Sequence, residues 1–137
     1  MYDEKYPSHI KTKVMFEDGD IIGQANAFWI SREKGIANIG YHVHPAYQQK
    51  GVGYQLTRSL LDDLSNGVRY FAVLTTDDNI SSQRLCEKLG FTHAPDEIRD
   101  VITNTDKYKK IPGPFLRVWA VNERPSKVFR RITTGKL

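Results

Sequence analysis

The sequence predicts a single α/β domain with a mixed sheet: an antiparallel meander first, then two parallel strands in the centre. Three short segments rich in β-branched and aromatic residues, joined by turn signals, fill the first 43 residues. The hydrophobic spacing then becomes helical near Tyr54 and gives way to a buried strand from Val68, which is the pattern of a crossover between parallel strands. A length of 137 residues suits one domain.

The meander is predicted to contain strands over residues 11–17, 21–30 and 36–43. Residues 17–20 (Glu-Asp-Gly-Asp) form the first turn, because glycine readily adopts a positive φ. Residues 31–35 form the second turn. Short turns between consecutive strands imply antiparallel pairing.

The second half is predicted to alternate helices and strands. Leucines at helical spacing indicate a helix over residues 54–65, and a buried strand follows over 68–75. A second helix is expected over residues 80–89. Residues 92–110 are polar and remain unassigned, and residues 115–121 form the last predicted strand.

Composition indicates a soluble cytoplasmic protein. The chain has one cysteine, no apolar run long enough to cross a membrane, and no secretory signal after its first residues. The whole chain, residues 1–137, is expected to form one domain with flexible ends at 1–10 and 124–137. Its net charge of +4 suits an anionic partner.

One loop carries the clearest functional signal. Pro45 ends the third strand, and Gly51 and Gly53 flank a single residue where the first helix begins. Such a loop exposes backbone N–H groups at a helix N-terminus, and glycine lets a ligand approach the backbone closely. Lys50 adds positive charge. These features predict a pyrophosphate-binding loop.

The loop Gln48-Gln49-Lys50-Gly51-Val52-Gly53 resembles the Gln/Arg-x-x-Gly-x-Gly/Ala signature of the GCN5-related N-acetyltransferase (GNAT) family. Residues 79–91 resemble the second block of that family, Asn-x-x-(Ala/Ser)-x-x-Leu-Tyr-Glu-Lys-Leu-Gly-Phe. The resemblance covers about residues 21–91. Within the family, the pattern formed by Ser82, Ile22-Gly23 and Gly40-Tyr41 is most similar to that of the branch that acetylates ribosomal-protein N-termini.

The resemblance implies acetyl-coenzyme A as co-substrate and a GNAT-like sheet whose central parallel strands splay around it, with flanking helices. The pantetheine arm would lie as a pseudo-strand along residues 41–44. Asn79 would bond that arm, or would simply cap its helix, a role asparagine fills well. The implied cofactor-binding residues are Tyr41, Val43, His44, Gln48, Gln49, Lys50, Gly51, Val52, Gly53, Tyr54, Asn79 and Ser82.

The family resemblance also implies direct attack of an amine on the thioester in a ternary complex, without an acyl-enzyme. The amine needs a base, the leaving thiolate needs a proton donor, and the oxyanion needs a hydrogen-bond donor. The backbone N–H near Val43 would polarise the thioester carbonyl.

Two positions depart from the usual pattern and leave the catalytic groups open. Asn38 stands where many relatives carry a glutamate base, and His42 should share its face of the strand. Histidine's ordinary pKa of about 6.5 suits a base, although His42 would equally serve as a hydrogen-bonded sheet residue. Cys86 stands where many relatives carry a tyrosine that protonates the leaving thiolate. Cys86 either donates that proton from its thiol or is a small hydrophobic residue buried in the core. The four histidines show no metal-ligand spacing, so no metal is expected.

The start of the chain is a further departure. Only about ten residues precede the first hairpin, where the family normally has helices that wall the acceptor site. We expect a naturally short domain, an open acceptor site, or completion by a second subunit in a homodimer. The acceptor amine would be a protein N-terminus, a lysine or a small amine. A catalytically degenerate, coenzyme A-binding regulatory module is the alternative, and nucleic-acid binding by the basic tail is not expected.

Overall fold

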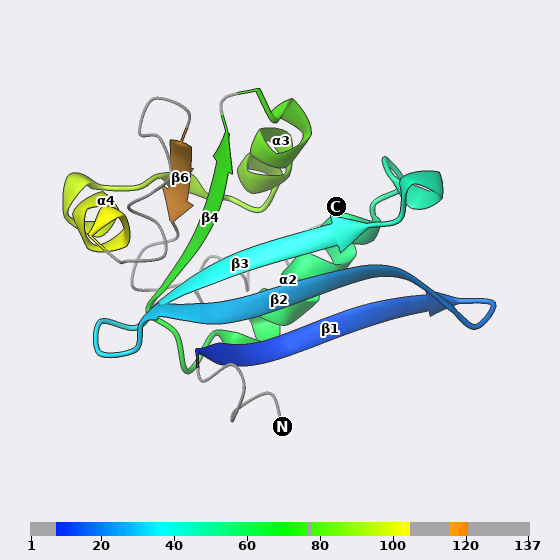
Figure 1. Ribbon diagram of the computed structural model, residues 1–137, viewed down its shortest axis with the longest axis horizontal. Coiled ribbons are helices and arrows are strands. Elements are labelled where there is room, and N and C mark those ends of the chain that lie inside the picture. The colour runs from blue at the N-terminus through cyan, green and yellow to red at the C-terminus, as the bar shows by residue number, and fades with distance from the viewer. Residues whose placement is uncertain (1–7, 77, 105–115, 121–137) are drawn as a thin grey trace.

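The computed structural model describes residues 8–76, 78–104 and 116–120, which form a six-stranded mixed sheet (Figure 1). The spatial order is β1-β2-β3-β4-β6-β5, with β1 at one edge. Strands β1, β2 and β3 are antiparallel neighbours, β4 runs parallel to β3, and β6 is antiparallel to β4 and β5. The strands are β1 His9–Glu17, β2 Asp20–Ser31, β3 Ile36–Val43, β4 Tyr70–Thr76, β5 Thr92–His93 and β6 Leu116–Ala120.

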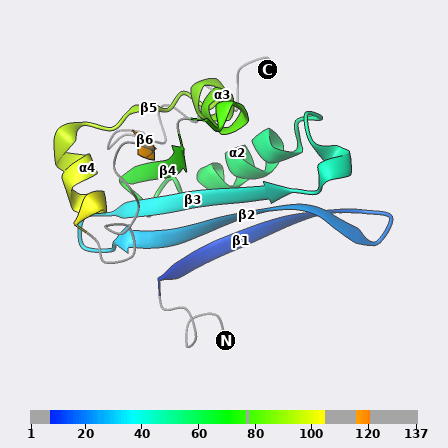
Figure 2. The same cartoon turned by 45° about the horizontal axis from the view of Figure 1, so that its top comes forward.

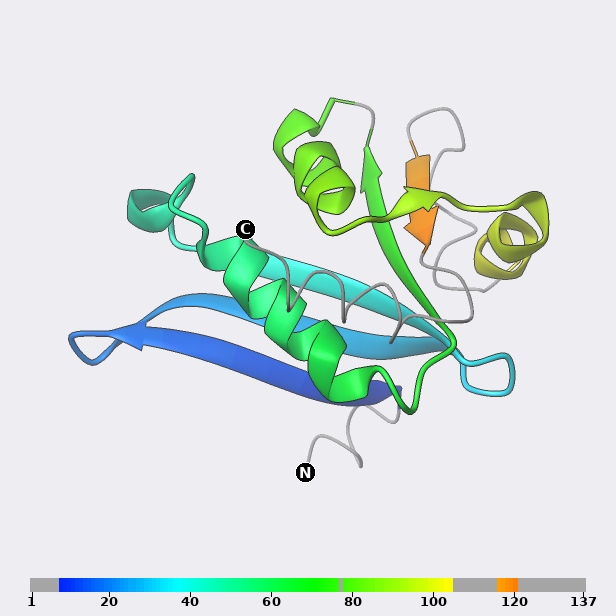
Figure 3. The same cartoon turned by 180° about the vertical axis from the view of Figure 1, so that it is seen from behind.

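Helices cover both faces of this sheet. Helix α2 (Val52–Leu64) crosses one face of β1, β2 and β3, as the view from behind shows (Figure 3). Helix α3 (Ile80–Lys88) shares the core under α2, because its Cys86 belongs to that buried cluster. Helix α4 (Asp96–Thr103) packs Ile98 and Ile102 on a second cluster (Figure 2). None of the helices in the described segments is long and apolar enough to cross a bilayer.

The two parallel strands separate soon after they meet. The β3–β4 ladder extends over three residue pairs, from Ile36–Tyr70 to Asn38–Ala72. Strand β3 then continues to Val43 next to β2, while β4 continues to Thr76 next to β6. The two strands visibly diverge towards their C-terminal ends (Figure 1).

Ion pairs attach the edge strand to helix α2. The ammonium groups of Lys11 and Lys13 lie 3.1 and 2.9 Å from the same Asp63 oxygen. Hydrogen bonds from Lys13 and Lys11 hold the pKa of Asp63 below its ordinary value. Both lysines are partly exposed, so each pair contributes no more than about 1 kcal/mol.

The sequence-based fold class is confirmed, with shifts at several boundaries. Strand β1 begins at His9, so residues 9 and 10 are strand rather than flexible chain. Of the other residues expected to be flexible, Ser8 lies in a turn and its carbonyl accepts the Trp29 N–H at 2.7 Å, whereas residues 1–7 and 124–137 lie outside the described residues. Helix α2 begins at Val52, before the apolar pattern starts, because its first turn belongs to the glycine loop.

Helix α4 was missed within the unassigned residues 92–110. Only Ile98 and Ile102 carry its buried face, and eight residues hold too little periodicity to stand out. The local signals are Pro95 at the N-cap and two acids, Asp96 and Glu97, in the first turn. Negative charge in the first turn complements the helix dipole.

Replacement of Gly23 tests the packing of α2 on β2. A Cβ atom at Gly23 would lie 2.9 Å from Val52 Cγ1 and 3.0 Å from Leu56 Cδ1, so helix side chains must shift. We expect Gly23→Ala to lower the free energy of unfolding by about 1–3 kcal/mol. The matched control is Gly40→Ala, because a Cβ there meets nothing within 4 Å. Urea denaturation of both variants measures the difference, and equal stabilities would contradict this packing.

Candidate functional site

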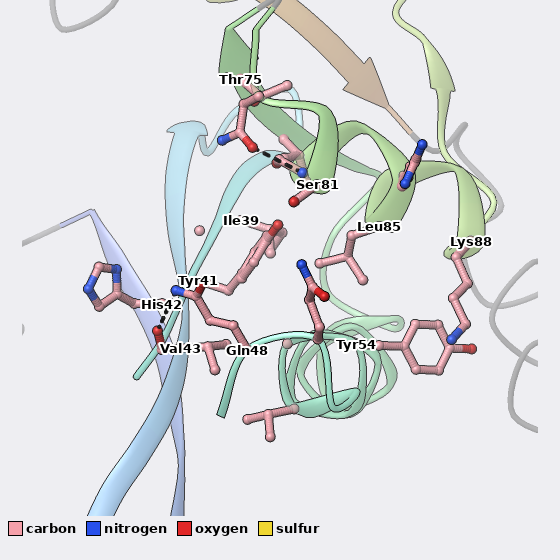
Figure 4. Close-up of a pocket in the computed structure, with 18 of the residues that line it drawn as sticks. Ile39, Tyr41, His42, Val43, Gln48, Tyr54, Thr75, Ser81, Leu85 and Lys88 are labelled. Carbon is pink, nitrogen blue, oxygen red and sulfur yellow. Dashed lines mark hydrogen bonds between the residues drawn. The ribbon is translucent and has the colours of Figure 1, made fainter. Parts of the chain in front are cut away.

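A cavity of about 930 Å³ opens where β3 and β4 diverge. Its walls come from the end of β3, the following loop, the first turn of α2, the end of β4 and helix α3 (Figure 4). The separation of the parallel strands therefore produces a hollow, and the glycine loop lies at its edge.

Local hydrogen bonds build the loop that follows β3. His44 Nδ1 accepts the Ala46 N–H at 3.1 Å and so caps the short 3-10 helix Pro45–Tyr47. Gln48 Nε2 donates to the Val43 carbonyl at 3.2 Å, which ties the loop back to the strand end. The loop then turns sharply through two left-handed residues, Gln49 with φ of 61° and Gly51 with φ of 83°.

The first turn of α2 is a site of positive potential. Gly51 is its N-cap and supplies no side-chain hydrogen bond, and the turn contains no acidic residue. The first N–H groups of the helix therefore lack a side-chain acceptor, and the helix dipole adds partial positive charge. Lys50 contributes a full charge and lies 5.5 Å from the Tyr47 ring centroid. This geometry suits a phosphate group.

Tyr47 also connects this loop to the β1–β2 hairpin. The pKa of Tyr47 is raised mainly by a hydrogen bond to Glu17, and the negative charge of that carboxylate raises it further. The His44 and Tyr47 rings meet edge to face, with centroids 5.9 Å apart. The loop is therefore fixed to the hairpin as well as to its own strand.

Tyr41 forms the floor of the cavity between α2 and α3. A Cβ atom on Gly53 would lie 3.4 Å from two carbons of the Tyr41 ring, an ordinary van der Waals distance, so the ring lies directly beside the first turn of α2. Burial raises the pKa of Tyr41, and a hydrogen bond with the Ser82 hydroxyl partly offsets that rise. The phenol is therefore a protonated hydroxyl at neutral pH, close to a second hydroxyl.

The opposite wall carries polar groups from β4 and α3. Asn79 Oδ1 accepts the Ser82 N–H at 3.1 Å, so Asn79 caps α3 while also lining the cavity. Thr75 lines the cavity at the end of β4, and its buried hydroxyl has no partner within the described segments. A buried hydroxyl without a partner is costly unless a ligand or water meets it.

The cavity brings together most of the predicted cofactor-binding residues. Those that line it are Tyr41, Val43, Gln48, Gln49, Gly51, Val52, Gly53, Tyr54, Asn79 and Ser82. His44 and Lys50 do not line it, since His44 caps the short helix and Lys50 stacks on Tyr47. Cavity residues that the sequence analysis missed include Thr75, Arg84 and Lys88. The sequence signal that could have identified Arg84 and Lys88 is their i, i+4 spacing, which places both on one face of a predicted helix.

The three predicted catalytic residues occupy different environments. His42 is exposed at the cavity rim and projects from β3 on the side away from Tyr41 (Figure 4). Asn38 does not line the cavity and is half-buried, four residues before His42 on the same strand. Side chains four apart on a strand share a face, as predicted.

Cys86 lies below the cavity in the hydrophobic core. Its side chain is 1% exposed, packs in the cluster under α2, and does not line the cavity. Burial, with a smaller effect of the Glu87 charge, raises the pKa of Cys86 to about 12. No group of three His, Cys, Asp or Glu side chains in the described segments is arranged to hold a metal ion.

Comparisons with known proteins agree with this architecture. The model of the acetyltransferase (GNAT) family matches residues 2–91. The N-alpha-acetyltransferase RimI of Mycobacterium tuberculosis is 38% identical over 78 residues, which cover 53% of this chain and 46% of that protein. The match thus spans less than half the length of this curated relative.

Two solved structures share the fold. The ribosomal-protein-S5-alanine acetyltransferase from Vibrio fischeri aligns with a TM-score of 0.66 at 18% identity, covering 88% of this chain and 65% of that one. The putative acetyltransferase yncA from Salmonella typhimurium, solved with acetyl-CoA, aligns with a TM-score of 0.65 at 24% identity, covering 88% and 69%. Because the family model spans well over half of the chain, this protein belongs to the GNAT acetyltransferase family.

Proposed function

We propose that this protein is an N-acetyltransferase that transfers an acetyl group from acetyl-CoA to an amine in a ternary complex. The observation that carries the proposal is the uncapped N-terminus of α2, which lines a cavity at the divergence of β3 and β4. Membership of the acetyltransferase family supports the same reaction. Acetyl-CoA supplies the reactive thioester.

The residues of the cavity fit acetyl-CoA. The first turn of α2 and the loop before it would hold the pyrophosphate. The free length of β3 beyond Asn38 offers a strand edge for the pantetheine amides. The buried Thr75 hydroxyl and the Asn79 side chain add polar groups on the facing wall.

We propose His42 as the base that takes the proton from the attacking amine. It is the histidine at the cavity rim, and it projects onto the face of the sheet opposite the Tyr41 floor. Val14, Gln24 and His42 are cross-strand neighbours in register, and all three are exposed. An acceptor on this face would therefore meet the thioester from the side away from the cofactor. Asn38 would position groups on that face rather than move protons.

The leaving thiolate needs a proton from another group. We propose that Cys86 packs in the core and takes no part, because its thiol does not line the cavity. The Tyr41 and Ser82 hydroxyls do line it and are hydrogen-bonded to each other. As the carbon–sulfur bond breaks, this pair would give a proton to sulfur and regain one from solvent.

The acceptor is proposed only as a class. The three candidate classes are a protein N-terminus, a lysine and a small amine. We favour a protein N-terminus because the curated relative is named an N-alpha-acetyltransferase. Among the described residues, no helix covers the face of β1–β3 away from α2 (Figure 1), which would leave room for an extended peptide or a second subunit. We also propose the cytoplasm as its compartment, in keeping with a single, buried thiol.

Gly53→Glu tests the phosphate site. A carboxylate at the second residue of α2 suits the helix dipole and preserves the fold, but it repels a bound pyrophosphate. We expect acetyl-CoA affinity to fall by roughly tenfold or more, the usual scale of a charge-assisted contact. Calorimetric titration measures the affinity, with the isosteric Gly53→Gln and the remote Gly67→Glu as controls. Unchanged binding in Gly53→Glu would place the cofactor elsewhere.

His42→Asn tests the base. We expect kcat to fall by about 10²–10⁴-fold with acetyl-CoA affinity unchanged, the range for loss of a general base. His93→Asn, on the distant strand β5, serves as the control. A full-rate His42→Asn enzyme would eliminate this role.

Cys86→Ala tests the structural role of the thiol. We expect near-parental turnover with an amine acceptor, together with slow reaction of the parental thiol with disulfide reagents at pH 8. The thiol, with its pKa raised to about 12, stays protonated at that pH in the folded state.

The raised pKa of Cys86 also predicts that the contribution of its thiol to the free energy of unfolding is present below about pH 8.5 and is lost as pH rises towards 12. Comparing unfolding free energies of parent and Cys86→Ala from pH 8 to 11 measures this, and a large loss of kcat would contradict the assignment.

A further inference from the structure

Two cations stand apart from the phosphate-binding loop on the other wall of the cavity. Among the described cavity-lining residues, Arg84 and Lys88 are the only ones with formally charged side chains, apart from a histidine. Both belong to α3 and are four residues apart, so they occupy one face of that helix. No acidic residue lines the cavity within the described segments.

Both cations are exposed, so their mutual repulsion without a ligand is weak. Like charges at i, i+4 on a helix repel each other. Within residues 8–76, 78–104 and 116–120, no carboxylate forms an ion pair with Arg84 or Lys88. By contrast, Lys11 and Lys13 share the carboxylate of Asp63 on the surface. An anion at the α3 wall would relieve the repulsion.

Tyr54 brings this wall next to the loop. Lys88 Nζ lies 4.4 Å from the Tyr54 ring centroid, and Figure 4 shows the ammonium beside the ring. Arg58 approaches the same ring at 6.0 Å. Tyr54 directly follows Gly53 in the first turn of α2, so the ring that Lys88 contacts is next to the proposed pyrophosphate site. Such cation–π contacts hold an ammonium group in place without neutralising it.

We propose that Arg84 and Lys88 bind the 3′-phosphate of coenzyme A and thereby select donors that carry it. The inference rests on the proposed function. The first turn of α2 accounts for the pyrophosphate, and the donor has one further phosphate, attached to the neighbouring ribose. A planar guanidinium binds two phosphate oxygens at once, and the lysine adds a point charge. Acyl donors that end at the phosphopantetheine arm, or that lack the 3′-phosphate, would lose these contacts.

The test compares acetyl-CoA with acetyl-3′-dephospho-CoA by calorimetric titration into the full chain. We expect the parent to prefer acetyl-CoA by roughly tenfold or more, the scale of charge-assisted phosphate contacts. In Arg84→Gln/Lys88→Gln the affinity for acetyl-CoA should fall to that for the dephospho ligand, which itself should change less than about twofold. Lys88→Arg keeps the charge and should retain most of the preference. Lys34→Gln, in the turn before β3, removes a remote positive charge and should change neither affinity.

The outcomes separate the two proposals. Equal binding of both ligands by the parent would overturn the role of Arg84 and Lys88 and leave the acetyltransferase proposal standing. Preference that survives in the double variant would also overturn it. Failure of the parent to bind either ligand would overturn the proposed function and this inference together. Thermal melting without ligand checks that the double variant is folded.

Discussion

The divergence of β3 and β4 is the constraint on which the site depends. After three paired residues the strands follow different partners, β2 on one side and β6 on the other. The core survives this gap because α2 and α3 share one buried cluster beneath it, while α4 supports the opposite face. A continuous parallel ladder would have filled the gap with interstrand hydrogen bonds and left no cavity beside the loop.

The loop after β3 turns that gap into an anion site by leaving donors without acceptors. A side chain can supply the missing acceptor at a helix start, as Asn79 does for α3. Helix α2 begins instead at a left-handed glycine that offers no cap. The hydrogen bonds of His44 and Gln48 fix the turn, so the exposed N–H groups are oriented before a ligand arrives. Preorganised donors bind more tightly than donors that must first be ordered.

Local signals in the sequence predicted the loop and the fold class, whereas packing decided the rest. Gly51, Gly53 and Pro45 act through their own backbone, so their positions alone indicated a phosphate loop. The placement of Arg84 and Lys88 at the cavity wall depends on the rotation of α3 about its axis, which its few apolar residues do not determine. The depth of Cys86 likewise follows from the contact of α3 with α2. Sequence reasoning could state the two roles of Cys86, but it could not predict the burial that supports the structural role.

The sole thiol of the chain, that of Cys86, is buried where oxidants do not reach it. Peroxides and disulfides react with thiolates, and the core position of Cys86 suppresses both ionisation and access. A tyrosine, serine or histidine near the donor carries no comparable liability. If the proposed acetyl transfer takes place in this cavity, its groups would not need a reductant to keep them in working form.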